Sequence, residues 1–375
     1  MLRITDAFDG GNIICRSILD PANIELEIRK DNQSDFYQWF YFRLSGARHQ
    51  DCALKIMNAS GAAYPKGFED YRAVASYDRQ SWFRVPTTYA DGVLTIRHRP
   101  DHDAVYYAYF APYSMERHAD LIARVAMDSR VRLEVLGPTL DGQDLDLLTI
   151  GEAAAGRKRV WIIARQHPGE TMAEWLVEGL LDRLLDANDP VAGRLLDKAV
   201  FRVIPNINPD GSRRGHLRTN AAGVNLNRTW KEPSLEKSPE VYLTRQAMHA
   251  HGVDFCLDVH GDEALPYNFL ASIAGIPSLS EKQTRLSAAY GQALLRASPD
   301  FQTDHGYPVP EPGKADLSMC SNFVAETFGS LALTLEQPFK DAANRPDPLH
   351  GWSPARAQIL GHACLDALLA VVDDL

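Results

Sequence analysis

Two side chains able to bind a metal ion lie three positions apart in the stretch ARQHPGETMAEWLVEG, residues 164–179. They are His167 and Glu170, and the residues between them, Pro168-Gly169, favour a sharp turn. An apolar run, VWIIA, comes before this turn, and an amphipathic run follows it. An imidazole and a carboxylate on such a turn can be aimed at one point.

Two further residues of this kind stand at the ends of apolar runs. His260 lies near the end of VDFCLDVHG, residues 253–261, and Glu336 lies near the end of SLALTLEQ, residues 330–337. In a mostly parallel sheet the carboxyl ends of the strands share one edge, and ligands bind in the crevice there. We therefore expect two histidines and a carboxylate to converge from segments that are far apart in the sequence, with Glu336 beside them.

Together, His167, Glu170 and His260 make a sufficient ligand set for a catalytic zinc ion that keeps water at its open position. Zinc lowers the pKa of its bound water toward ~7. A carboxylate outside the ligand set can then accept a proton from that water. Glu336 is placed to be this base.

The elements that must position these residues alternate between strands and helices after about residue 115. Strands are predicted at 157–165, 199–207, 253–261 and 330–337, and helices at 170–187, 238–252, 281–297 and 354–372. This alternation predicts an α/β domain over residues 116–375, with a mixed, mostly parallel central sheet flanked by helices.

The first 115 residues have a different character, because helical periodicity is scarce there and aromatic, β-prone runs dominate. Such runs occupy 36–47, 92–100 and 103–114, with turn signals between them. The pattern predicts an all-β sandwich domain over residues 1–115 that precedes the α/β domain.

A segment rich in Asn, Gly and Arg, NPDGSRRGHLRTNAAGVNLNRTW, covers residues 208–230 after a predicted strand. Arginines in such a segment usually form a solvated face, but Arg228 lies between Asn227 and Trp230, where a surface arginine has no obvious purpose. Arginine binds a carboxylate through two parallel charge-assisted hydrogen bonds. Beside a zinc site it indicates a substrate with a free carboxylate near the cleaved bond, such as a peptide C-terminus.

Structural explanations compete with these assignments. A His-x-x-Glu pair occurs by chance, and most of the twelve histidines are expected on the surface or in the core. His249 and His251 lie near a helix end and point in different directions. His260 differs from them because it follows an apolar strand and precedes a glycine. A buried Glu336 is costly unless it is paired or functional.

The motifs taken together resemble those of zinc metallocarboxypeptidases of the carboxypeptidase A type, and most closely the bacterial type of the cytosolic carboxypeptidase subfamily. The matching pieces, in family order, are HPGE (167–170), NPDG (208–211), GVNLNR (223–228), LDVHG (257–261) and TLE (334–336). QWFYFRLSG and YYAYFAPYS, in the N-terminal part, are similar to the β-sandwich of that subfamily. The resemblance therefore extends to nearly the whole chain.

The resemblance also implies roles for the matching residues. His167, Glu170 and His260 are implied as the ligands of one zinc ion, and Glu336 as the general base that activates water. These roles agree with those argued from the residues alone.

Two roles next to the metal come from the resemblance. Arg218, ten residues before Arg228, is implied as the group that polarises the scissile carbonyl and stabilises the oxyanion. Asn227 and Arg228 are implied as the clamp on the terminal carboxylate of the substrate.

The chain departs from the family pattern at three points. Asn225 replaces the usual aspartate that supports a zinc-bound histidine; it can accept from an imidazole N–H but strengthens the ligand less. The tyrosine that usually precedes the catalytic glutamate is missing, and Tyr307 is the nearest. In glutamate-removing members a basic residue lines the side-chain pocket; a gapless count back from Glu336 places that position near Ser321, which is not basic, and Lys314 would substitute for it only if its loop folds inward.

Composition sets the broad class. The 375 residues are enough for two domains, and a net charge of −10 argues against a nucleic-acid partner. The five cysteines form no CxxC pair and fit a reducing compartment. The N-terminus lacks the apolar core of a signal peptide, and no apolar stretch approaches the ~20 residues that span a bilayer. We expect a cytoplasmic protein without a membrane partner, and a homo-oligomer is possible.

The sequence thus predicts a zinc-dependent metallocarboxypeptidase that hydrolyses the C-terminal bond of a peptide or protein. One alternative is a zinc amidohydrolase that deacylates N-acyl amino acids, which the sandwich domain and the pair Arg218 and Arg228 disfavour. Another is a non-catalytic relative that binds carboxylates or peptides, which the retained ligands and Glu336 disfavour. The preferred terminal residue and the physiological substrate stay open.

Overall fold

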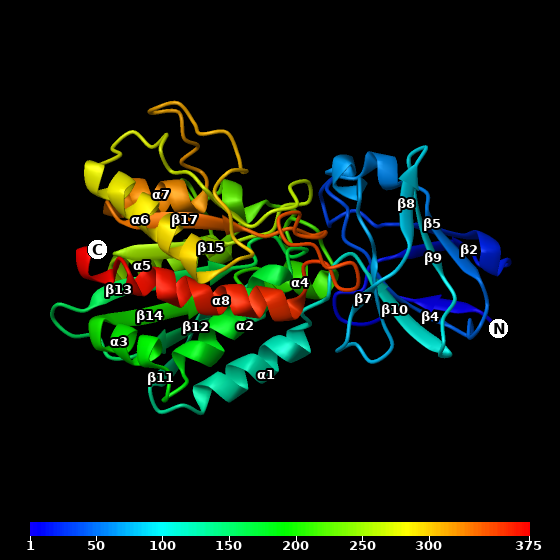
Figure 1. Cartoon of the computed structure of the whole chain (residues 1–375), viewed down its shortest axis with the longest axis horizontal. Helices are drawn as coiled ribbons and strands as arrows, with labels where there is room; N and C mark the ends of the chain where they lie inside the picture. The colour runs from blue at the N-terminus through cyan, green and yellow to red at the C-terminus, as the bar shows by residue number, and fades with distance from the viewer.

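The computed structural model describes residues 1–375 and has two parts that lie side by side (Figure 1). The N-terminal part, blue to cyan in the figure, is built from strands and short 3₁₀ turns. The second part is a sheet covered by helices. The predicted fold class, a β-domain followed by an α/β domain, is confirmed.

Two five-stranded sheets form the N-terminal part, with the orders β1-β4-β10-β6-β7 and β2-β3-β5-β9-β8. The strands of the first sheet are β1 Arg3–Thr5, β4 Tyr41–Ser45, β6 Val74–Ser76, β7 Phe83–Arg84 and β10 Ala104–Ala108. The strands of the second are β2 Ile14–Ser17, β3 Ile24–Glu27, β5 Cys52–Ile56, β8 Thr87–Ala90 and β9 Val93–His98. The 3₁₀ turns are η1 Pro21–Asn23, η2 Ala59–Gly61 and η3 Pro65–Phe68. All three runs predicted as strands contain one, although each strand is shorter than its run.

The second part has a seven-stranded mixed sheet of order β11-β12-β14-β13-β15-β17-β16. Its strands are β11 Val131–Pro138, β12 Asp144–Ile150, β13 Lys158–Ala164, β14 Ala199–Ile204, β15 Phe255–Val259, β16 Phe269–Ala271 and β17 Leu331–Glu336. The four central strands, β14, β13, β15 and β17, run parallel, whereas the outer strands join through antiparallel ladders.

Helices cover both faces of this sheet, because successive side chains of the central strands point to opposite sides. In β13, Val160 and Ile162 join the core shared with α2 (Met172–Leu184), α3 (Pro190–Lys198), α6 (Glu281–Ala297) and α8 (Pro354–Leu369). Trp161 and Ile163 join the core shared with α5 (Pro239–His251) and α7 (Cys320–Phe328). The central strands are therefore buried on both sides, as expected for parallel strands.

Several elements that follow the sandwich were not predicted. They are α1 (Met115–Ala126), α3, α4 (Pro209–Arg214), α7, β11, β12 and β16. The helix α1 buries one face, which consists of His118, Leu121, Ile122 and Val125. Most of β11 is exposed or half-exposed, and β16 has only three residues, so their hydrophobic patterns are weak.

The two parts share one continuous hydrophobic core of 77 buried residues. Tyr109, just after β10, stacks on Phe339, just after β17, with ring centroids 4.6 Å apart. The sandwich ends with β10 at Ala108, and α1 begins at Met115. The boundary between residues 115 and 116 stays a prediction. None of the helices combines the length and the apolar character needed to cross a membrane.

Candidate metal centre and active site

The ends of three neighbouring strands bring the predicted site together. β13, β15 and β17 are adjacent and parallel, so their carboxyl ends share one edge of the sheet. His167 lies three residues after β13, His260 directly follows β15, and Glu336 is the last residue of β17. These residues therefore meet at the carboxyl edge of the sheet, where ligands of such sheets bind.

The three predicted ligands form one buried cluster. His167 Nδ1 lies 2.6 Å from Glu170 Oε1, and His260 Nδ1 lies 2.8 Å from Glu170 Oε2. The two Nδ1 atoms are 3.2 Å apart. One ligand atom from each residue therefore lies within 4.8 Å of the other two.

The turn between His167 and Glu170 is held from both sides. Arg165, with φ +63°, donates hydrogen bonds to Pro168 O, Tyr113 O and the Glu174 carboxylate over 2.7–3.0 Å. Gly169 N donates to Leu217 O at 2.9 Å, and a Cβ at Gly169 would stand 3.0 Å from that oxygen. The close approach of the two chain segments thus favours glycine here, because a side chain would push them apart by a few tenths of an ångström.

A second layer of polar groups orients the two rings. His167 Nε2 lies 3.1 Å from Asn225 Oδ1, and His260 Nε2 lies 2.9 Å from Asp258 Oδ2. Each acceptor favours the hydrogen on Nε2, which leaves Nδ1 free to coordinate a metal. Asn225 therefore makes the contact expected of the family aspartate.

Asp258 and Gln166 were not recognised from the sequence. Gln166 Nε2 donates to Asp258 Oδ2 at 2.7 Å, and Gln166 Oε1 accepts from Trp230 Nε1 at 2.8 Å. This chain fixes the carboxylate that supports His260. Asp258 precedes His260 by two residues, so strand periodicity places both on the same face, and that signal could have identified it.

Electrostatics at the cluster favour a neutral histidine beside an ionised glutamate. Burial, together with the charge of Arg218, lowers the pKa of His167 to about 4. Burial works to raise the pKa of Glu170, but His167 and His260 outweigh it and lower that pKa. Burial works to lower the pKa of His260, but Asp258 and Glu170 raise it well above the ordinary value.

The donor set fits a divalent cation. Two imidazole nitrogens and one carboxylate are a common protein ligand set for catalytic zinc. Several carboxyl groups also crowd the same pocket: burial, and then Glu170, raise the pKa of Glu263 well above its ordinary value. Burial raises the pKa of Glu336 to about 8, with Glu170 adding to the effect and His260 opposing it. A cation between the ligands would offset this concentration of negative charge.

A pocket of about 280 Å³ opens beside the cluster. It is lined by 13 residues, which are Tyr64, His167, Glu170, Arg218, Asn227, Arg228, Gly261, Asp262, Glu263, Ala264, Tyr307, Met319 and Glu336. Of the seven predicted site residues, only His260 is missing from this lining, because it is buried behind Glu170. Tyr64, Asp262 and Glu263 were not expected, and Tyr64 comes from the N-terminal sandwich.

The two predicted arginines differ in exposure and contacts. Arg218 forms no ion pair, and its guanidinium lies near the rings of Phe36 and Tyr64, at 5.6 and 5.4 Å from their centroids. The Arg228 side chain is 44% exposed, and its Nε is 3.9 Å from Asp316 Oδ2. Arg228 Nη1 also donates to Asn227 O at 2.6 Å, so both guanidinium groups keep N–H groups that are free for a ligand in the pocket.

Asn227 already has a structural contact: its Oδ1 accepts a hydrogen bond from Cys320 N at 2.8 Å, at the start of α7. Its Nδ2 has no protein acceptor, so it can donate to a ligand.

Tyr307, Lys314 and Ser321, which concern two of the departures from the family pattern, lie in different surroundings. Tyr307 lines the pocket, and its hydroxyl donates to Asp262 Oδ2 at 2.6 Å. Lys314 is exposed and does not line the pocket, so its loop does not fold inward. Ser321 is buried, and its Oγ accepts from Thr334 Oγ1 at 2.8 Å.

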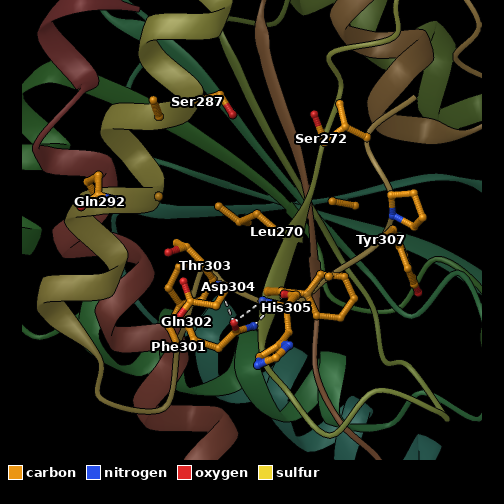
Figure 2. A pocket seen from close by; sticks show the side chains of 17 residues that line it. Leu270, Ser272, Ser287, Gln292, Phe301, Gln302, Thr303, Asp304, His305 and Tyr307 are labelled. Atoms are coloured by element: carbon orange, nitrogen blue, oxygen red, sulfur yellow. Dashed lines mark hydrogen bonds between the residues drawn. The ribbon is translucent and has the colours of Figure 1, made fainter. Parts of the chain in front are cut away.

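A larger cavity, of about 510 Å³, lies beside the edge strand β16 and the helix α6 (Figure 2). Figure 2 shows Leu270 in its middle, Ser287 and Gln292 of α6 on one side, and Tyr307 on the other. Tyr307 is shared with the smaller pocket. The larger cavity holds none of the metal-binding group, so the candidate active site is the smaller one.

Comparisons with known proteins agree with this site and fold. A family model described as "Cytosolic carboxypeptidase N-terminal domain" matches residues 4–110, and one described as "Zinc carboxypeptidase" matches residues 118–269. The chain is similar to human cytosolic carboxypeptidase 1, with 27% identity over 298 residues. That alignment covers 68% of this chain but only 24% of the human protein.

Solved structures of bacterial proteins match over the full length. A metallo-carboxypeptidase from Burkholderia cenocepacia is 50% identical with a TM-score of 0.97, covering 100% of this chain and 99% of that one. A metallo-carboxypeptidase from Pseudomonas aeruginosa, solved with (2-guanidinoethylmercapto)succinic acid, is 44% identical with a TM-score of 0.97 and covers 99% of each chain. The chain therefore belongs to the zinc carboxypeptidase family, as a metallocarboxypeptidase related to the cytosolic carboxypeptidases.

Proposed function

We propose that this protein is a zinc-dependent carboxypeptidase that hydrolyses the C-terminal peptide bond of peptides or proteins. The observation that carries the proposal is the buried group of His167, Glu170 and His260, which borders a pocket shared with Arg218, Arg228 and Glu336. One pocket thus offers a metal ligand set, a candidate base and two cationic groups.

In this proposal His167, Glu170 and His260 hold one zinc ion. When bound, zinc supplies a Lewis acid that makes water a better nucleophile and polarises the scissile carbonyl. Glu336 accepts a proton from the attacking water, and its buried Oε2, which has no protein partner, is available for that bond. Arg218 stabilises the negative charge that develops on the carbonyl oxygen.

The other two side chains restrict the reaction to a chain end. Arg228 binds the terminal carboxylate of the substrate through charge-assisted hydrogen bonds, and Asn227 donates from its Nδ2. An internal peptide bond has no carboxylate at this position, so both groups would lose their partner. The Pseudomonas aeruginosa relative in complex with a succinic acid derivative supports recognition of a carboxylate by this family.

We also infer a cytoplasmic location. All five cysteines are free, four of them buried, which suits a reducing compartment. The match to the cytosolic carboxypeptidase N-terminal domain supports the same location.

The substitution Glu336→Gln tests the mechanism. We expect the rate of peptide hydrolysis to fall about 10²–10⁴-fold, the usual range for loss of a general base, while one zinc per chain is retained. Hydrolysis is read by mass spectrometry on peptides with varied C-terminal residues, and zinc by elemental analysis. Glu311→Gln, a change at an exposed site outside the pocket, is the matched control.

Three results would contradict the proposal. Full activity of the Glu336→Gln variant would show that Glu336 is not the general base. Cleavage of N-acyl amino acids in preference to peptides would indicate a deacylase. A wild-type protein that neither binds zinc nor cleaves any peptide would indicate a binding protein.

A further inference from the structure

The loop that carries Arg218 is held by the N-terminal sandwich rather than by the α/β domain alone. Asp31, in the segment after β3, accepts hydrogen bonds from three consecutive backbone amides, Leu217 N at 2.7 Å, Arg218 N at 2.8 Å and Thr219 N at 2.9 Å. Its Oδ2 also lies 3.1 Å from Thr219 Oγ1, which donates to it. One carboxylate thus binds four donors on this loop.

Because Asp31 is buried, its carboxylate has to be stabilised by hydrogen bonds from the protein. Asp31 is only 3% exposed, and it forms no salt bridge with a basic side chain. Its charge is therefore stabilised by the loop amides, and the amides have no other acceptor in its place. Hydrogen bonds to an ionised acceptor are about twice as strong as neutral ones. Loss of the Asp31 carboxylate would therefore leave the loop amides without an acceptor.

Neighbouring residues of the sandwich hold the ends of the same loop. Gly10 N donates to Arg213 O at 3.0 Å, and Asn12 Nδ2 donates to Gly215 O at 2.8 Å. Asn32 Nδ2 donates to Ala221 O at 2.7 Å. The loop is therefore fixed at its beginning, its middle and its end.

The side chain of Arg218 is also oriented by the sandwich. Its guanidinium lies 5.6 Å from the ring centroid of Phe36 and 5.4 Å from that of Tyr64, close enough for cation–π attraction. Gln38 fixes Tyr64 in turn, since its Oε1 accepts from Tyr64 N at 2.8 Å and its Nε2 donates to Tyr64 O at 3.0 Å. The guanidinium forms no ion pair, although the carboxyl groups of Glu263, Glu170 and Glu336 act on it electrostatically, so its N–H groups stay free for a ligand in the pocket.

We propose that Asp31 is a positioning residue that fixes Arg218 for catalysis, so that the N-terminal sandwich is a working part of the active site. The proposal rests on the proposed function, because it assigns Asp31 an effect on the reaction through Arg218. A purely structural Asp31 would instead stabilise the contact between the two parts without changing turnover per folded, zinc-loaded molecule.

The test is a double-mutant cycle with Asp31→Asn and Arg218→Ala in the full-length, zinc-loaded protein. The asparagine keeps the size of the side chain but places an N–H₂ group against backbone donors. We expect Arg218→Ala to lower kcat ~10²–10³-fold, as for loss of an oxyanion-stabilising group. Asp31→Asn is expected to lower kcat about 10-fold with little change in KM or zinc content, and to have no further effect in the Arg218→Ala background.

Amide hydrogen exchange supplies a readout that needs no activity. The amides of Leu217, Arg218 and Thr219 should exchange faster in Asp31→Asn than in the wild type. Faster exchange with unchanged kcat would overturn the positioning role, and so would a loss of kcat that is fully additive with Arg218→Ala. If the wild type binds zinc but cleaves no peptide, the proposed function fails, and without turnover for Asp31 to affect, the positioning role fails with it.

Two more variants keep the test decisive if Asp31→Asn does not fold. Phe36→Leu removes one ring from beside Arg218 without touching the buried hydrogen bonds, and it should also lower kcat without an additive effect in Arg218→Ala. Asp78→Asn is the control: Asp78 is another sandwich carboxylate, and its Oδ1 accepts from two consecutive backbone amides, Gln80 N at 2.8 Å and Ser81 N at 2.7 Å, between β6 and β7 and outside the Arg218 loop. Asp78→Asn should leave kcat unchanged, whereas an equal loss of kcat in it would overturn the specific role of Asp31.

Discussion

The two histidines of the metal-binding group are oriented by polar side chains that are not themselves metal ligands. His167 and His260 present Nδ1 to the same point because Asn225 and Asp258 occupy their Nε2 sides. The two supports are unequal, since one is a neutral amide and the other a carboxylate. Asn225, the weaker of the two supports, is therefore the position at which a substitution can change the affinity for zinc.

Replacing Asn225 by Asp should strengthen zinc binding. A carboxylate accepts more strongly from His167 Nε2–H, raises the basicity of Nδ1, and in comparable sites such a support changes metal affinity about 10–100-fold. We expect zinc affinity to rise about 10-fold, measured by competition with a chromophoric chelator. Asn188→Asp, at an exposed position, controls for the added charge. Equal or weaker zinc binding by Asn225→Asp would show that the contact does not tune the ligand.

At the scale of elements, the closest packing in the α/β domain is the crossing of α2 and α8. A Cβ at Gly361 of α8 would stand 2.2 Å from Leu176 O of α2, and one at Gly179 of α2 would stand 2.4 Å from Gln358 Cα of α8. The two glycines let the helix backbones approach each other. Since α2 starts directly after the turn that carries His167 and Glu170, this crossing also supports the site.

Gly361→Ala should therefore destabilise the fold. The added methyl group overpacks the crossing, which typically costs about 1–3 kcal/mol in the free energy of unfolding. Gly193→Ala is the control, because nothing lies within 4 Å of a Cβ at that position of α3 and alanine favours a helix by about 0.5–1 kcal/mol. Chemical denaturation measures both. A stabilised Gly361→Ala protein would contradict this description of the crossing.

Another element, α5, contains a buried acid that makes stability depend on pH. Burial raises the pKa of Glu240 to about 8, although Asn220 Nδ2 lies 3.3 Å from both carboxylate oxygens and opposes the shift. The folded state then keeps a proton that the unfolded chain releases above its ordinary pKa of 4.5. Stability from this group is complete below that value and is lost as pH rises toward about 8.

The substitution Glu240→Gln should remove this dependence. One proton taken up on folding corresponds to about 1.4 kcal/mol per pH unit, so between these two pKa values the wild type should lose up to that much more stability per unit than the variant. Urea denaturation at several pH values measures the two slopes. Glu236→Gln, at an exposed position just before α5, should keep the wild-type slope. Parallel slopes for wild type and Glu240→Gln would refute the assignment.

At the scale of the whole molecule, the sandwich and the α/β domain are not independent units. They share one hydrophobic core of 77 residues and the stacked pair Tyr109 and Phe339. Polar contacts add to this: Arg84 Nη1 lies 3.2 Å from Asp341 Oδ2, and Lys340 Nζ donates to Glu69 O at 2.7 Å. The Asp31 contact to the Arg218 loop belongs to the same interface.

We therefore expect one cooperative unfolding transition. Exposing the shared core costs free energy in whichever part remains folded, so neither part should stay folded alone. Differential scanning calorimetry of the full chain should show a single peak whose calorimetric and van't Hoff enthalpies agree. Two resolved transitions would show that the interface couples the two parts only weakly.

Local patterns in the sequence were enough for the main features of the fold and for the residues of the metal-binding group. Apolar runs of strand length predicted all four parallel strands. A wide apolar stripe predicted α2, start and stop residues predicted α5, and α6 and α8 were also expected as helices. The helices α1 and α7 and the short strand β16 were not predicted, although α1 buries one regular face that includes Leu121, Ile122 and Val125. The positions of His260 and Glu336 at strand ends followed from the rule that parallel strands end on one edge.

The sequence by itself therefore determined the two-part fold through its periodicity, and it indicated the family and the candidate zinc ligands through motifs that resemble the family and through residues at strand ends. Only the tertiary structure decided what supports and surrounds those groups. Asp31 meets Thr219 across 188 positions of sequence, and Tyr64 and Tyr307 reach the pocket from separate parts of the chain. Such contacts arise from the packing of one domain on another, which no local pattern encodes.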